Sequence, residues 1–164
     1  LLNAGHEASV NGLGNGIVAA LHHPDQMDML RADPEGVSPT ALEEFLRFDS
    51  PLHLFERTAT EDTVIGGVTV NAGQKIAALL GSANRDETVF DEPDRMMLRR
   101  DPNPHLGFGA GIHFCIGAPL ARMEMSVALP ALISRFPDIQ LSRPPTLRGT
   151  FVLRGWAEVP IKLS

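Results

Sequence analysis

The sequence is poor in cysteine, in lysine and in long apolar runs, and it carries no excess of positive charge. Its one cysteine, Cys115, excludes an internal disulfide framework and is typical of a reducing compartment, so we expect a cytoplasmic protein. No apolar run approaches the roughly 20 residues that a membrane-spanning helix needs. The net charge of −6 excludes the basic footprint of a nucleic-acid-binding protein. We therefore predict no nucleic-acid partner and no membrane segment in this portion.

The length and composition indicate one domain with a hydrophobic core. The chain has 164 residues, of which 43% are hydrophobic. Twelve of its 14 basic residues are arginines, whose planar fork suits pairing with carboxylates. The chain opens with Leu1 and no methionine, apparently inside a helix, and we interpret it as a fragment.

Apolar periodicity and turn signals predict a mainly α fold with small β-sheets (α+β). Ser38 and Pro39 have the residue types of a helix start, as N-cap and first-turn proline. A long Pro/Gly-rich segment over 91–114 lacks a regular pattern, which in a compact domain indicates a functional loop. The predicted helices cover residues 1–23, 24–32, 38–50, 82–90 and 116–136, and the predicted strands cover 57–60, 63–65, 68–70, 75–80, 139–141, 150–154 and 159–163.

The segment around Cys115 has the residues that a thiolate–metal ligand requires. Glycines let the backbone adopt unusual conformations and approach a flat group closely. Cys115 falls at the start of a predicted helix, where unpaired amides and the helix dipole favour a negative sulfur. Phe108 is placed to exclude water from the sulfur, and His113 to reach a carboxylate. The pattern is Phe108-Gly109-x-Gly111-x-His113-x-Cys115-x-Gly117.

Purely structural, zinc-binding and dinucleotide-binding roles fit this segment less well. A lone cysteine is most often a buried small hydrophobe, but here it has patterned neighbours. A zinc site of His105, His113 and Cys115 lacks a fourth ligand at usable spacing. The glycine strings at 12–16 and 107–111 miss the dinucleotide-binding spacing.

With the trailing Leu120-Ala121-Arg122, the cysteine segment resembles the haem-binding loop of the cytochrome P-450 superfamily. The resemblance extends over residues 1–164 and implies the C-terminal part of a single P-450 domain, with the N-terminal half absent. It implies haem b (iron protoporphyrin IX) as cofactor and Cys115 as the iron ligand, in a family where thiolate ligation favours O–O cleavage. Phe108, Gly109, Gly111 and Gly117 would form the cofactor wall.

The resemblance also assigns roles outside the cysteine loop. Glu44 and Arg47 match the family's Glu-x-x-Arg motif, which forms a buried network with an arginine before the cysteine, here taken as Arg95. Arg57 matches an arginine that pairs with a haem propionate, and His113 is the second such anchor. For His105, propionate binding and a loop-stabilising role are both open.

Glu7, Ala8 and Ser9 resemble the family's oxygen-activation segment. Glu7 matches an acid that helps to deliver protons, and its residue type suits that task. The next position is usually threonine and is Ala8 here, while Ser9 lies about 100° further round the helix. Three accounts are open: water or a substrate hydroxyl replaces the threonine, a helix distortion moves Ser9, or the chemistry is oxidative coupling or peroxide-driven turnover.

The resemblance implies a soluble bacterial haem-thiolate monooxygenase that inserts one atom of O2 into a small organic substrate. A ferredoxin or flavodoxin with an NAD(P)H reductase is the expected electron donor, and Arg99, Arg100 and Arg122 are candidates for its basic docking patch. The alternative is an incomplete, non-catalytic fragment.

Overall fold

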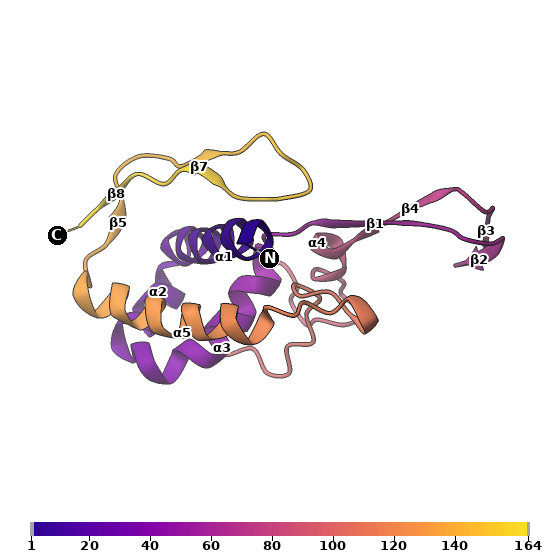
Figure 1. The fold of residues 1–164 in the computed structure, drawn as a ribbon. Coiled ribbons are helices and arrows are strands. Elements are labelled where there is room, and N and C mark those ends of the chain that lie inside the picture. Colours follow the sequence, from indigo (N-terminus) through magenta and orange to yellow (C-terminus); the bar gives the residue numbers. More distant parts are fainter. Residues whose placement is uncertain (1, 164) are drawn as a thin grey trace.

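The computed structural model describes residues 2–163 as a layer of helices flanked by short antiparallel strand pairs (Figure 1). The predicted mixture of helices and small sheets is confirmed. Helix α5 packs on α3, and α1 packs on both. The helices are α1 (Leu2–His22), α2 (Pro24–Ala32), α3 (Pro34–Phe48), α4 (Leu80–Ala83) and α5 (Ala118–Arg135), with a 3₁₀ turn η1 (Gly111–His113).

Close packing on α3 holds α1 together despite its glycines. Glycine disfavours a helix by about 1 kcal/mol against alanine, so α1 depends on burial rather than on propensity. A Cβ atom on Gly16 would lie 2.1 Å from Cδ2 of the fully buried Phe45 in α3. Glycine is therefore what lets these two helix backbones meet, and the adjoining residues 17–20 of α1 are buried.

The predicted start of α3 is wrong by one turn. Asp33 is the N-cap, and its Oδ1 accepts a hydrogen bond from the Gly36 amide at 2.9 Å. Proline stands at the first helical position, Pro34, which is the favoured place for it. Ser38 lies inside the helix and donates its hydroxyl to the Pro34 carbonyl. Two signals of a capping residue followed by proline compete along this segment, and the earlier one caps the helix.

Within residues 2–163, the strands form four two-stranded antiparallel sheets. The first predicted strand begins earlier than expected, at Leu54, and Leu80 belongs to α4 instead of β4. Of the predicted helix over 82–90, only residues 82 and 83 are helical, as the end of α4. The predicted strand over 150–154 is wrong, since only Leu153 forms an isolated bridge, with Leu52. The strands are β1 (Leu54–Thr58), β2 (Thr63–Ile65), β3 (Val68–Val70), β4 (Lys75–Leu79), β5 (Gln140–Leu141), β6 (Thr146–Leu147), β7 (Trp156–Glu158) and β8 (Ile161–Lys162).

Residues 84–110 contain no helix or strand, as the sequence pattern predicts for most of this segment. The loop nevertheless contributes the buried side chains of Met96 and Leu98 to the core. Within residues 2–163, none of the helices combines the length and the apolar character that crossing a bilayer requires.

Alanine substitutions at two glycines of α1 should change the free energy of unfolding in opposite directions. Gly16→Ala forces a methyl group into the Phe45 ring, and overpacking of this kind costs about 1–3 kcal/mol in the free energy of unfolding. Gly14→Ala meets no atom within 4 Å and should gain up to about 1 kcal/mol from helix propensity. Urea unfolding of both variants measures the difference, and equal effects would contradict the close-packing argument.

Candidate functional site

Cys115 is a free, half-buried thiol in the turn that leads into α5. Its amide donates to the Phe108 carbonyl at 3.0 Å, which closes the segment into a loop. Gly109 and Gly111 adopt φ values of +72° and +67°, in the left-handed region that favours glycine. Gly117 is the N-cap of α5, and a Cβ atom built on it would lie 3.8 Å from the Cys115 sulfur, so the sulfur lies at the start of this helix.

Apolar side chains surround the cysteine without being covered by the described residues. Ile112 is 98% exposed and Ile116 is 87% exposed, on either side of Cys115. Phe114 and Leu120 are each about half exposed. Four exposed apolar side chains within nine residues of sequence make this segment a candidate binding surface. A Cβ atom built on Gly111 would have no other atom within 4 Å, so the space next to this residue is open. A thiol beside an uncovered apolar surface and an open backbone fits a large, flat, apolar group that carries a metal.

Strand β1 packs directly on the cysteine loop. A Cβ on Gly109 would lie 3.1 Å from Cε2 of Phe55, so the ring fills the space that the glycine leaves. The guanidinium of Arg57 lies 5.2 Å from the centre of the same ring, and Nη1 donates to the Glu56 carbonyl. Arg57 is exposed, as is His113 on η1. Phe55 is a site residue that the sequence analysis missed, because an aromatic residue in a strand carries no signal of its own.

A buried ion-pair network centres on Glu44, which is fully buried in α3. Arg47 binds its carboxylate with both ends of the guanidinium, Nε to Oε2 at 2.7 Å and Nη2 to Oε1 at 2.8 Å. The buried pair agrees with the network that the Glu-x-x-Arg motif implied. The Met97 amide donates to Oε1 at 2.8 Å and Asn103 Nδ2 to Oε2 at 3.2 Å, so the carboxylate also holds the loop.

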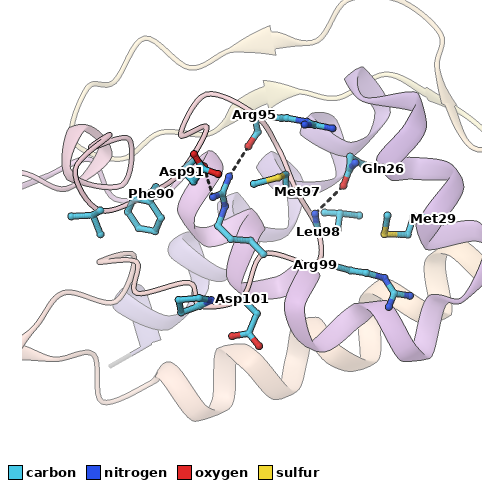
Figure 2. Close-up of a pocket in the computed structure, with 12 residues that line it drawn as sticks. Gln26, Met29, Phe90, Asp91, Arg95, Met97, Leu98, Arg99 and Asp101 are labelled. Atoms are coloured by element: carbon cyan, nitrogen blue, oxygen red, sulfur yellow. Dashed lines mark hydrogen bonds between the residues drawn. The ribbon is translucent and has the colours of Figure 1, made fainter.

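The third member of this network is Arg100, and the prediction of Arg95 is wrong. Arg100 Nε lies 3.2 Å from Glu44 Oε2, and its side chain is 5% exposed. The Arg95 side chain is 58% exposed and pairs with Glu92. Arg95 takes part only through its carbonyl, which accepts from Arg47 and from Arg100. Figure 2 draws the second of these bonds. The loop reverses between the two arginines, which spacing along the sequence does not reveal.

Arg47 and Arg100 also donate hydrogen bonds to backbone carbonyls of the loop, which have no partner in a helix or strand. Nη1 of Arg47 donates to the carbonyls of Asn84 and Pro93, each at 2.8 Å. Arg100 donates to those of Asp91 and Glu92. Its burial removes Arg100 from the predicted basic docking patch.

His105 binds α3, not the open surface. Its ring is 3% exposed, and both nitrogens have protein partners: Nε2 lies 2.7 Å from Glu43 Oε2, and Nδ1 accepts from the Gly107 amide at 3.0 Å. The structure supports the loop-stabilising role instead. Arg122 binds the same carboxylate, Nε to Oε1 at 2.6 Å and Nη2 to Oε2 at 2.9 Å. Burial would raise the pKa of Glu43, but the hydrogen bonds from Arg122 and His105 lower it to about 2.

The three predicted oxygen-activation residues lie on the first turns of α1. Ala8 and Ser9 are partly buried, and Glu7 is exposed. Arg148, in the loop between β6 and β7, donates from Nη1 to Glu7 Oε1 at 2.8 Å. Figure 1 shows that α1 and α5 begin at the same end of the helical layer. The ion pair joins α1 to the C-terminal strands, a contact between distant segments that sequence reasoning missed.

A hollow in the described part of the chain lies away from the cysteine loop. It has a volume of about 590 Å³ and is lined by α2 and the loop, including Gln26, Met29 and Arg99 (Figure 2). Gln26 accepts from the Leu98 amide at 2.9 Å, which fixes the loop on α2. None of its lining residues belongs to the cysteine loop, so we assign the cofactor surface from the thiol and its apolar neighbours instead.

Comparisons with known proteins point to one family. A family model described as Cytochrome P450 matches residues 36–154. The chain is 42% identical over 159 residues to the biotin biosynthesis cytochrome P450 of Bacillus subtilis, covering 96% of this chain and 40% of that protein. It is 46% identical over 167 residues to nocardicin C N-oxygenase of Nocardia uniformis, covering 98% and 42%. The chain thus spans about two fifths of the length of these relatives.

Solved structures agree with the sequence comparisons. P450BioI in complex with an acyl carrier protein that carries hexadec-9Z-enoic acid matches with a TM-score of 0.94 at 42% identity, over 98% of this chain and 42% of that chain. CYP109E1 of Bacillus megaterium in complex with testosterone matches with a TM-score of 0.95 at 34% identity, over 99% and 46%.

The loss of stability in Arg100→Ala and in Arg95→Ala should show which of the two arginines belongs to the buried network. Arg100→Ala removes a buried partner of Glu44 and leaves loop carbonyls without donors, so it should lower the free energy of unfolding by about 3 kcal/mol or more. Arg95→Ala keeps the bonded carbonyl and removes an exposed side chain, with an effect within about 0.5 kcal/mol. Chemical denaturation measures both, and a larger loss for Arg95→Ala would show that Arg95 is the third member after all.

Glu43 should make stability depend on pH. Its pKa is about 2 in the folded protein against 4.5 ordinarily, so its contribution is complete above pH 4.5 and is lost as the pH falls towards 2. The difference in unfolding free energy between wild type and Glu43→Gln should be constant above pH 4.5 and shrink below it. Denaturant titrations at stepwise lower pH measure this, and a difference that stays constant down to pH 2.5 would contradict the assigned pairing.

Proposed function

Because the chain belongs to the cytochrome P450 family, whose members are haem monooxygenases, we propose that it supplies the sulfur-bearing wall of such an enzyme. Residues 1–164 would form the C-terminal part of one P450 domain. The observation that carries the proposal is the free Cys115 among exposed apolar side chains at a helix start. The proposed reaction inserts one atom of O2 into a small organic substrate.

The residues of the loop fit a haem group. Cys115 Sγ would bind the iron, and the amides at the start of α5 would stabilise its negative charge. Ile112 and Ile116 would pack against the macrocycle, which would remove their exposed apolar surface from water. The open backbone at Gly111 gives the ring room. Arg57 and His113, both exposed, would bind the propionates of haem b through charge-assisted hydrogen bonds.

When bound, haem with a thiolate ligand supplies the activation of O2. The chain's own part in that chemistry is to deliver protons. We assign this to the Glu7 carboxylate, which Arg148 holds at 2.8 Å and which has no threonine beside it. The Glu7 carboxylate would take up a proton from solvent and release it through water, Ser9 or a hydroxyl of the substrate, in place of the side chain that Ala8 lacks.

The partners belong to the same proposal. A ferredoxin or flavodoxin with its NAD(P)H reductase would deliver electrons in the cytoplasm, and the exposed Arg99 and partly exposed Arg122 are the remaining candidates for its docking surface. An acyl carrier protein, as in the P450BioI complex, is the other partner class that the comparisons suggest.

Replacing Cys115, the proposed iron ligand, tests the proposed function. The protein is expressed with whatever coding sequence flanks these 164 residues, and its carbon monoxide difference spectrum is recorded. Wild type should show the signature of axial sulfur, and Cys115→Ser should lose it because the thiolate is removed.

Val127→Ala is the control, since it changes an exposed apolar side chain of α5 at the third turn and should keep the signature. A sulfur signature that survives Cys115→Ser would reject the proposal. Haem binding by the flanked protein but not by the 164 residues alone would identify the chain as an incomplete, non-catalytic piece.

A further inference from the structure

Two adjacent glutamates of α3 serve different clusters. Glu44 is buried in the arginine network, whereas Glu43 reaches to α5 and to the loop before the cysteine. Its carboxylate binds Arg122 with both oxygens, at 2.6 and 2.9 Å, and Oε2 also meets His105 Nε2 at 2.7 Å. Glu43 therefore ties together three segments of the chain, because His105 and Arg122 lie 62 and 79 residues from it in the sequence.

The hydrogen bonds fix the charge of this cluster. Nδ1 of His105 accepts from the Gly107 amide at 3.0 Å, so the ring proton is on Nε2, which donates to Glu43. The carboxylate of Glu43 and the guanidinium of Arg122 cancel each other's charge.

Arg122 connects the cluster to the sulfur. Its guanidinium carbon lies 4.6 Å from the ring centre of Phe108, and the Phe108 carbonyl accepts the Cys115 amide at 3.0 Å. The hydrogen bond to Glu43 raises the pKa of Arg122, and attraction to the Cys115 sulfur adds to this effect. Arg122 therefore packs on the residue whose carbonyl binds the cysteine amide, and Glu43 is the group that neutralises its charge.

We propose that Glu43 is a positioning residue for Cys115, which holds Arg122 against Phe108 and cancels the positive charge beside the sulfur. The inference rests on the proposed function, in which that sulfur binds haem iron. An uncancelled positive charge near the thiolate favours the state with one more electron, the ferrous state. The one-electron ferric/ferrous equilibrium therefore reports the charge balance of the cluster.

The test is a double-mutant cycle on the haem-loaded protein, titrated with a chemical reductant. Glu43→Gln leaves Arg122 uncancelled and should shift the equilibrium towards ferrous by about threefold or more. Arg122→Gln leaves Glu43 uncancelled and should shift it towards ferric by a similar factor. The double variant should return close to wild type. A purely structural role would not reverse in sign.

Glu124→Gln is the matched control, because it removes one negative charge from an exposed position of α5, two residues from Arg122. Solvent screens such a charge, so its shift should stay below about twofold. Shifts in the same direction for Glu43→Gln and Arg122→Gln, or none, would overturn the inference. Where Glu43→Gln does not load haem, Arg122→Gln decides alone: a shift towards ferric supports the inference and no shift overturns it. A wild type without the sulfur signature would reject the proposed function and this inference with it.

Discussion

The arrangement of this chain depends on the ion pairs that the Glu44 carboxylate forms with two arginines. This carboxylate lies fully buried between Arg47 and Arg100, and the two guanidinium groups together bind loop carbonyls over residues 84–95. A segment without helix or strand needs such donors, since buried carbonyls that lack a partner are costly. One ion-pair network thus replaces regular secondary structure and sets where the chain re-enters the core before the cysteine.

The sequence predicted the parts of the site that are local. The order Phe108, glycine, His113 and Cys115 specifies a loop that closes on itself before a helix, and the structure has that loop. The buried Glu44–Arg47 pair was predicted from the resemblance to the family's Glu-x-x-Arg motif, since spacing along a helix alone does not distinguish a buried pair from a solvated one.

Contacts between distant segments were not readable. Arg95 and Arg100 are five residues apart in a loop without periodicity, and only the path of the backbone decides which side chain turns inward. His105 was ambiguous because Glu43, its partner, lies 62 residues away. The same reason hides Phe55 from sequence reasoning, since its role depends on the glycine that it packs against.

The apolar side chains around Cys115 have a consequence for the life of the polypeptide before it acquires its cofactor. Ile112 and Ile116 protrude into water on either side of the thiol. While it is not covered, such an apolar surface favours self-association between copies or binding by a chaperone. The supply of porphyrin during synthesis would then govern how much soluble protein a cell accumulates, independently of how stable the finished fold is.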